Sequence, residues 1–261
     1  AGGTLWAQVK VSFVNPIIGT NGMGHTFPGA CVPFGLVQLS PDTDTIPHNV
    51  DGKYQPRSYE YCAGYQHKDS SIVGFSHTHF SGTGHSDLGD ILIMPATGSL
   101  KLNPGTATDP DGGYRSRFSH DTEISCPGYY EVMLSDYGVK AQLTTTKRVG
   151  VHKYTFSGDG GNQRIILDMI HGIYNYDGKV LWTNIRVEND TLVTGYRITN
   201  GWARTNYIYF AMSFSKPVIH YGCEEKAKVN YRGGYGKFNM KENFPDIGGR
   251  KIVAYFDFDP A

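Results

Sequence analysis

The feature that most limits the fold is a series of short strand-like segments in the second half of the sequence. From Tyr114 onward, runs rich in valine, isoleucine, tyrosine and threonine alternate with turn sequences such as Ser157-Gly158-Asp159-Gly160-Gly161. They recur at a spacing of roughly 8 to 12 residues. No segment keeps the hydrophobic period of a helix over a helix length. This pattern predicts an all-β fold, a large antiparallel β-sandwich with few or no long helices.

The expected strands cover most of the chain after Pro95. They are residues 114–118, 129–134, 139–146, 149–156, 164–169, 180–187, 191–196, 207–214 and 251–258. Shorter strands are expected earlier, at residues 9–14, 36–39, 72–75 and 91–94. The polar segment 223–243 is expected to be a surface loop between strands.

Composition excludes several classes of function. The 24 basic and 24 acidic residues balance, so no basic surface for nucleic acid or an anionic membrane is expected. No run approaches the roughly 18 apolar residues of a membrane span. The 18 tyrosines suit stacking on sugar rings, although tyrosine is also common in strands. Trp182 and Trp202 are candidates for a sugar groove, but a tryptophan in a strand more often belongs to the core.

The cysteines and the N-terminus bear on the compartment. The four cysteines form no Cys-x-x-Cys pair, which disfavours a zinc cage and leaves disulfides of undefined pairing open. They are Cys31, Cys62, Cys126 and Cys223. Residues 1–8 are small and uncharged, as in a signal-peptide remnant cleaved near Ala7 or Gln8, or in an ordinary disordered terminus. Residues 9–261 are expected to form one domain that ends at a cut rather than at a natural terminus.

The segment most suggestive of a binding site runs from Gly74 to Asp90. It combines His77, His79 and His85 with four glycines, several hydroxyl residues and two aspartates. Glycines let the backbone approach a ligand closely, and the polar side chains supply donors and acceptors. In an extended backbone, side chains two residues apart share a face, so the first two rings are expected to address one ligand or metal. The alternatives are a solvated polar face, or side chains that hold the loop in place.

Two other segments carry candidate residues. Residues 19–35 are rich in glycine and proline but contain aromatic anchors, which is typical of an ordered functional loop. His25 in this loop is either a site residue or a partner of loop carbonyls. The pair Asp42 and Asp44 suggests a cation or a sugar, although turn capping by aspartate is the commoner explanation.

Three motifs occur in the order and spacing of one known family. They are Asn15-Pro16-Ile17-Ile18-Gly19-Thr20, then Gly24-His25-Thr26-Phe27-Pro28-Gly29-Ala30 with Val32-Pro33-Phe34-Gly35, and Gly74-Phe75-Ser76-His77-Thr78-His79-Phe80-Ser81-Gly82-Thr83-Gly84. Residues 38–42 and 86–90 also fit. Over essentially its whole length the sequence resembles glycoside hydrolase family 92, the calcium-dependent α-mannosidases of Bacteroides-type gut bacteria.

The resemblance implies an enzyme with two domains. An N-terminal, supersandwich-like β-sandwich would join a C-terminal helical barrel, with the active site between them, and only the first domain matches this chain. In the family, the acid and base carboxylates and most calcium ligands belong to the helical domain. We therefore expect no catalytic residue and no metal ligand here, and an inactive isolated chain. The whole protein is expected to be a secreted or periplasmic, exo-acting, inverting α-mannosidase that requires calcium.

The resemblance also implies which loops would contact mannose. The expected substrate-binding residues are His25, Tyr59, Tyr61, Cys62, His77, His79, Ser81, Gly82, Thr83, Gly84, His85 and Asp87. Many α-1,2-mannosidases of the family carry tryptophan just before the cysteine that matches Cys62. This chain has Tyr59 and Tyr61 there, which leaves the linkage specificity open. The expected partners are mannose-containing glycans and the helical domain of the same protein.

Two other classes of protein compete with this interpretation. A non-catalytic carbohydrate-binding module would hold mannose on the same aromatic loops without any enzyme. A metal-dependent oxygenase of the cupin type is suggested by His77-Thr78-His79. Cupins require a glutamate a few residues later, where this chain has Thr83 and Gly84, so the binding module is the stronger alternative.

Overall fold

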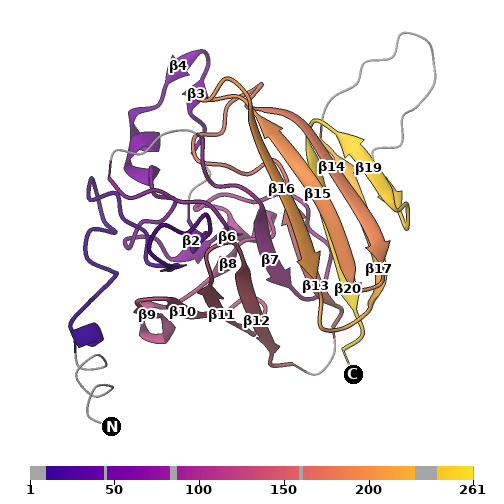
Figure 1. Cartoon of the computed structure of the whole chain (residues 1–261), viewed down its shortest axis with the longest axis horizontal. Helices are drawn as coiled ribbons and strands as arrows, with labels where there is room; N and C mark the ends of the chain where they lie inside the picture. The colour runs from indigo at the N-terminus through magenta and orange to yellow at the C-terminus, as the bar shows by residue number, and fades with distance from the viewer. Residues whose placement is uncertain (1–9, 44–45, 83–86, 159–160, 227–239, 261) are drawn as a thin grey trace.

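The computed structural model describes residues 10–43, 46–82, 87–158, 161–226 and 240–260, and most of their regular structure is β-strand (Figure 1). All pairs between described strands are antiparallel, as predicted. The short 3-10 helices are η1 (Pro56–Tyr61), η2 (Pro110–Gly112) and η3 (His120–Thr122). Within the described ranges, no helix has the length and apolar character needed to span a membrane.

An eight-stranded sheet forms the centre of the molecule, in the order β1-β2-β6-β7-β13-β20-β17-β18. Its strands are β1 (Ala30–Cys31), β2 (Gln38–Asp42), β6 (Gly74–Ser76), β7 (Leu92–Ala96), β13 (Gln163–Asp168), β17 (Val218–Glu225), β18 (Met240–Glu242) and β20 (Ile252–Phe258). Because this sheet joins both ends of the described chain, it is the frame on which the other sheets pack.

Two four-stranded sheets and two small ribbons complete the fold. The sheet β12-β11-β10-β9 contains β9 (Ile124–Cys126), β10 (Tyr129–Leu134), β11 (Val139–Thr145) and β12 (Gly150–Phe156). The sheet β16-β15-β14-β19 contains β14 (Val180–Asn189), β15 (Leu192–Thr199), β16 (Asn206–Ser213) and β19 (Asp246–Gly249). The ribbons pair β3 (Asn49–Val50) with β4 (Lys53–Tyr54), and β5 (Ser71–Ile72) with β8 (Ser116–Arg117).

The central strands are buried on both faces. Every residue of β20 is buried. Val253 and Tyr255 belong to a core cluster with residues of β10 and β11. Ile252, Ala254 and Phe256 belong to a second cluster with residues of β14 and β15. Since successive side chains of a strand point to opposite faces, the two four-stranded sheets cover opposite faces of the central sheet. The predicted β-sandwich is therefore confirmed, and it has three layers.

Two of the expected segments are wrong. Residues 10–14, expected in a strand, form local turns, with the amide of Phe13 donating to Lys10 O at 3.3 Å and the amide of Val14 donating to Val11 O at 3.1 Å. The segment 223–243 is not simply a surface loop, because Cys223 is buried in β17 where that strand pairs with β20. The sequence did not predict β17 because the second half of this strand is polar, and it is covered only where β17 pairs with β18 and β20.

The four cysteines are all free thiols, so the disulfides that the sequence left open are not formed. Cys62 and Cys223 are buried, Cys126 is half-buried and Cys31 is exposed. The domain is therefore held by its packed sheets and not by covalent cross-links.

Candidate functional site

Loop segments that lie far apart in the sequence meet beside β2 and β6. The rings of His25 and Tyr59 contact edge to face at 4.9 Å, and the amide of Gly82 donates to His25 O at 2.8 Å. The thiol sulfur of Cys62 lies 2.7 Å from the Tyr174 hydroxyl. We call this assembly the loop cluster; it comprises the described parts of segments 19–35, 54–65, 76–90 and 170–180. In Figure 1 its first segments, coloured indigo to magenta, gather to one side of the four-stranded sheets.

Asp42, at the end of β2, is the centre of a buried network beneath the loop cluster. Its Oδ1 lies 2.8 Å from His79 Nε2, and its Oδ2 lies 2.9 Å from His171 Nε2. His79 Nδ1 lies 2.7 Å from the carbonyl oxygen of Gln38, so both nitrogens of this ring face acceptors and the geometry suits an imidazolium. Burial alone would raise the pKa of Asp42, but the charge and hydrogen bonds of the two imidazoles lower it below its ordinary value.

The network explains why a glycine occupies position 64, in segment 54–65 of the loop cluster. Gly64 has φ of +82°, a left-handed conformation that favours glycine. A Cβ at this position would lie 2.0 Å from Asp42 Oδ1 and 3.1 Å from the His79 ring. The backbone after η1 therefore packs directly on the Asp42 carboxylate. Asp42 therefore bonds two histidines and does not cap a turn, which was the commoner explanation for this aspartate. Asp44 lies outside the described residues.

A second buried ion pair anchors the end of the histidine-rich segment. Asp90 Oδ1 accepts from Arg197 Nη2 at 2.5 Å and from Arg197 Nε at 3.1 Å. Asp90 Oδ2 accepts from the Thr78 hydroxyl at 2.7 Å. Arg197, on β15, also donates to the carbonyls of Met169, at 3.4 Å, and His171. The pair thus ties the 76–90 segment to the third layer of the sandwich, which is a structural role for Asp90.

His77 and His79 do not share one partner. His77 Nδ1 lies 2.7 Å from Ile91 O, and its Nε2 lies 3.0 Å from His152 Nε2 on β12. His79 instead faces Asp42 and Gln38. Both rings are held by partners inside the chain, so the expectation that they address one ligand or metal does not describe this structure. They support the loops from below.

The other predicted contact residues are divided between the interior and the surface. Tyr61 and Cys62 are buried, and the Tyr61 hydroxyl donates to Asp69 at 3.1 Å. Tyr59 is half-buried, whereas Ser81 and Gly82 are exposed. Thr83, Gly84 and His85 lie outside the described residues. The surface members are therefore the ones free to reach a ligand.

Asp87 positions an exposed tryptophan. Its carboxylate accepts from the backbone amides of Trp202, at 2.7 Å, and Ala203, at 2.9 Å. The Trp202 side chain is 79% exposed, and Phe80 in the neighbouring segment is 57% exposed. Trp182 is 42% exposed, and its ring lies against Gly248. Trp202 therefore adds an aromatic surface beside the 76–90 segment.

A family model described as the glycosyl hydrolase family 92 N-terminal domain matches residues 13–261. The chain belongs to this family. The resemblance seen in the three sequence motifs is therefore confirmed. The match concerns the N-terminal domain only.

Solved structures support the assignment of this family 92 domain. An α-mannosidase of the same family from Bacteroides thetaiotaomicron, in complex with mannoimidazole, is 39% identical with a TM-score of 0.80; the match covers 95% of this chain and 30% of that one. An inverting mannosidase from the same organism is 26% identical with a TM-score of 0.68, over 96% of this chain and 29% of that one.

A curated relative gives a more distant match. An uncharacterized secreted glycosidase of Arthroderma benhamiae is 29% identical over 55% of this chain and 17% of its own length. The family 92 domain thus spans about a third or less of the relatives that it matches.

Sequence reasoning missed several buried titratable residues of this domain in or next to the loop cluster. They are His171, Lys179, Arg197 and Asp168. Lys179 is 1% exposed, and its ammonium group donates to the carbonyl of Ile173. Burial and the nearby Arg197 charge lower the pKa of Lys179 to about 7. The only sequence pattern that could have identified these residues is a charged residue within or next to a strand-like run. The same pattern is typical of a strand at the solvent-exposed edge of a sheet.

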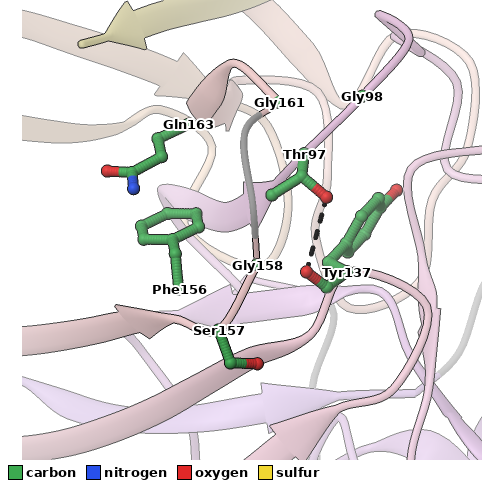
Figure 2. Close-up of a pocket in the computed structure, with 8 residues that line it drawn as sticks. All are labelled: Thr97, Gly98, Tyr137, Phe156, Ser157, Gly158, Gly161 and Gln163. Atoms are coloured by element: carbon green, nitrogen blue, oxygen red, sulfur yellow. Dashed lines mark hydrogen bonds between the residues drawn. The ribbon is translucent and has the colours of Figure 1, made fainter. Parts of the chain in front are cut away.

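A pocket of about 270 Å³ lies elsewhere in the family 92 domain, between the ends of β7 and β12 and the turn after β10 (Figure 2). It is lined by Thr97, Gly98, Tyr137, Phe156, Ser157, Gly158, Gly161 and Gln163. The Thr97 hydroxyl donates to the Tyr137 carbonyl at 3.4 Å. Among the described residues, none of the predicted site residues lines this pocket, and the lining residues given above include no carboxylate or imidazole for acid–base chemistry.

The His77–His152 contact predicts sensitivity to mild acid. Burial lowers the pKa of His77 to about 4 and lowers that of His152 as well. Between pH 6.5 and 4 the unfolded chain therefore binds more protons than the folded chain, so stability falls as pH falls. For one such ring, the expected loss between pH 7 and pH 5 is about 2 kcal/mol. Urea unfolding at the two pH values measures it.

A matched pair of variants isolates this contribution from other titrating groups. The His152→Gln variant should lose less stability between pH 7 and pH 5 than the native chain. A His220→Gln variant changes a more exposed histidine and should keep the native acid sensitivity. If His152→Gln is as acid-sensitive as the native chain, the assignment to this contact is wrong.

Proposed function

We propose that this family 92 domain supplies substrate-binding loops to a secreted or periplasmic, exo-acting α-mannosidase that cleaves its substrate with inversion. The observation that carries the proposal is the loop cluster, in which segments distant in sequence converge over the buried Asp42 network. The 39% identity to an α-mannosidase supports the substrate class. The likeness to an inverting mannosidase supports the stereochemistry.

The chemistry of inversion indicates what must come from outside this domain. Inverting hydrolysis requires an acid and a base carboxyl roughly 6.5 to 9.5 Å apart on opposite sides of the scissile bond. The aspartates in and beneath the loop cluster are already engaged: Asp42 by two imidazoles, Asp90 by Arg197, Asp87 by two backbone amides, and Asp177 by Lys251. None of them is placed to exchange a proton with a sugar. We therefore assign the acid and the base to a C-terminal helical domain of the same protein.

Calcium is assigned to that second domain for a similar reason. Calcium takes six to eight oxygen ligands in proteins. In the described part of the chain, the only group of at least three closely spaced His, Cys, Asp or Glu side chains is His67, His120 and Glu123, outside the loop cluster. The engaged aspartates of the loop cluster do not form a calcium cage. When bound to the whole enzyme, calcium would orient the hydroxyl groups of the sugar.

The proposed mannose contacts are the exposed residues of the loop cluster together with half-buried Tyr59 and the buried His25 that packs on it. Tyr59 presents an aromatic ring, and His25 packs against its edge. Ser81 and Gly82 are exposed and offer a hydroxyl and backbone groups. An aromatic face packs on the apolar face of a pyranose while polar groups bond its rim. We propose that Tyr59 takes the place of the tryptophan found in many α-1,2-mannosidases, with α-1,2-linked mannosides as the proposed substrate.

The test compares this chain with the full-length protein. The isolated chain is expected to release no mannose from α-1,2-mannobiose and to bind mannose weakly or not at all by calorimetry, whereas the full-length protein releases mannose. In the full-length protein, Tyr59→Ala is expected to lower kcat/KM about tenfold through the lost ring contact. Tyr207→Ala, which changes an exposed tyrosine on β16, is the control.

Three outcomes would count against the proposal. Release of mannose by the isolated chain at the full-length rate would place the catalytic groups in this domain. Tight mannose binding by the isolated chain, without activity in the full-length protein, would favour a carbohydrate-binding module. Equal effects of Tyr59→Ala and Tyr207→Ala would remove Tyr59 from the site.

A further inference from the structure

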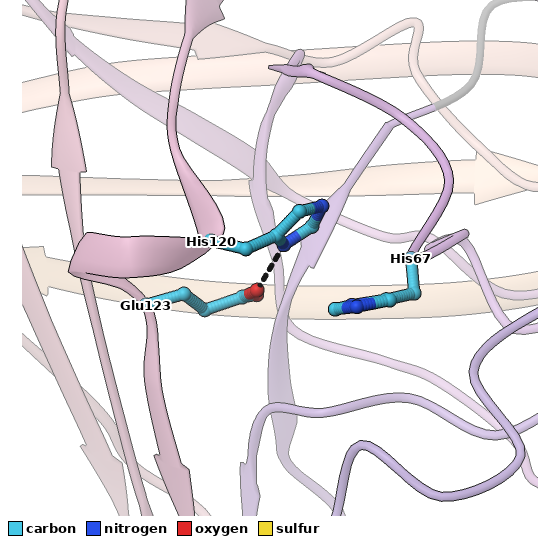
Figure 3. A group of neighbouring side chains, drawn as sticks. All are labelled: His67, His120 and Glu123. Atoms are coloured by element: carbon cyan, nitrogen blue, oxygen red, sulfur yellow. Dashed lines mark hydrogen bonds and ion pairs between the residues drawn. The ribbon is translucent and has the colours of Figure 1, made fainter.

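His67, His120 and Glu123 form a compact group that the proposed mannosidase function does not use (Figure 3). His67 lies in the turn that follows segment 54–65. His120 is the first residue of η3, and Glu123 follows the last residue of that helix. One ligand atom from each side chain lies within 4.8 Å of the others. Figure 3 shows the carboxylate directed at the His120 ring, with the His67 ring alongside; the two ring centroids are 4.0 Å apart.

The Glu123 carboxylate is held in place by two tyrosines. Its side chain is 3% exposed, and its Oε1 accepts from the hydroxyls of Tyr65, at 2.9 Å, and Tyr130, at 2.7 Å. Burial and the charge of Glu123 raise the pKa of both phenols, so both remain protonated donors. A buried carboxylate is costly without a cationic partner. Among the described residues, its ion-pair partner is His120, whose Nδ1 lies 2.7 Å from Oε2.

The two imidazoles keep coordinating capacity. The His120 side chain is 38% exposed, and its Nε2 has no hydrogen-bond partner among the described residues, so Nε2 can carry the ring proton when Nδ1 binds a metal. The His67 ring has one long hydrogen-bond contact among the described residues, from Nδ1 to the Tyr65 hydroxyl at 3.4 Å. Two imidazoles beside one oriented carboxylate are a ligand set that suits zinc and similar divalent transition metals. Calcium prefers oxygen ligands and is disfavoured here.

We propose that His67, His120 and Glu123 bind one zinc-type divalent ion, with solvent in the fourth position. Zinc bonds of about 2.0 to 2.2 Å place neighbouring ligand atoms roughly 3.3 Å apart. The half-exposed His120 ring can rotate to reach that spacing, while the tyrosines keep the carboxylate fixed. The ion replaces the proton between His120 Nδ1 and Glu123, and that proton moves to Nε2 or, from an imidazolium, to solvent.

The site would join two segments of the chain and brace the loop cluster from outside. The amide of His67 donates to Thr20 O at 2.8 Å, and the amide of Gly22 donates to Gln66 Oε1 at 2.7 Å. The turn that carries His67 therefore supports the start of the 19–35 loop. A metal shared with η3 would fix this turn to the β9–β10 sheet, so its role is structural and it adds stability in proportion to its occupancy.

Calorimetric titration of the chelator-treated chain with zinc chloride tests the site. We expect one zinc per chain, a rise in the melting temperature on binding, and an affinity at least tenfold weaker in His67→Gln and His120→Gln. His220→Gln is the matched control, because His220 is also part-exposed and lies 3.4 Å from a carboxylate oxygen of Asp257. Calcium chloride should produce no heat at this site and no change in zinc affinity.

Cobalt substitution gives a second readout that does not depend on activity or stability. The visible absorption of tetrahedral cobalt should appear with the native chain and with His220→Gln, and should be lost with His120→Gln. Circular dichroism of each variant without metal should match the native chain, since both imidazoles are at least partly exposed. Absence of zinc binding, unchanged affinity in both cluster variants, or an equal loss in His220→Gln would each overturn the proposal.

Discussion

The Asp42→Asn variant is expected to lose about 3 to 5 kcal/mol of unfolding free energy, the usual cost of breaking a buried ion pair. Asp42 is 1% exposed and bonds His79 and His171 with separate oxygens. An amide removes the charge and offers one acceptor where the carboxylate offered two. His79, with acceptors at both nitrogens, would then be a buried cation without its counter-ion, or would lose a proton and one hydrogen bond.

Urea unfolding at pH 7, followed by tryptophan fluorescence, measures this loss. Asp111→Asn is the control, since it removes a carboxylate of an exposed pair with Arg117 and should leave the unfolding midpoint unchanged. In the full-length protein, Asp42→Asn should also raise KM for α-mannobiose at a temperature where the variant is folded, because the loops rest on this network. A variant as stable as the native chain would show that the network contributes little.

The pH dependence separates Asp42 from the His77–His152 contact. Because the pKa of Asp42 is lowered in the folded chain, its stabilising contribution is present above the unfolded value near 4 and is lost as pH falls through the folded value. The histidine contribution is lost at higher pH, between 6.5 and 4. The two variants should therefore change the stability profile in different pH ranges.

The Arg197→Met variant is expected to cost a similar 3 to 5 kcal/mol, because it leaves Asp90 buried without its cation. Methionine keeps much of the length of the arginine side chain but removes its hydrogen bonds to Asp90 and to the carbonyls of Met169 and His171. Equilibrium unfolding measures the loss. Arg186→Met, on β14, is the control, because that arginine is 61% exposed and pairs with Glu188 at the surface.

A double-mutant cycle tests whether the effect belongs to the pair. Asp90→Asn combined with Arg197→Met should cost clearly less than the sum of the two single variants, with a coupling of at least about 1 kcal/mol. Strict additivity would show that the two residues act independently, and the assignment of the 76–90 anchor to this ion pair would then be wrong.

Strands were predicted correctly from the sequence where one face is buried and the other face is closer to solvent. The predicted segment 129–134 is the same as β10, whose residues alternate between half-buried and buried. The predicted strand at residues 251–258 matches β20 within one residue. The sequence could not reveal that β20 is covered on both faces, because a continuous apolar run looks the same in either case.

The sequence by itself determined the all-β class, the approximate positions of most strands, the family and three of the four segments that form the loop cluster. These depend on local chemistry: strand alternation, turn residues and motif spacing. Only the tertiary structure decided that Asp42 bonds both His79 and His171, and that Asp90 bonds Arg197. Those contacts join residues between 37 and 129 positions apart, and the pairing of sheets that brings them together is not encoded in any local pattern.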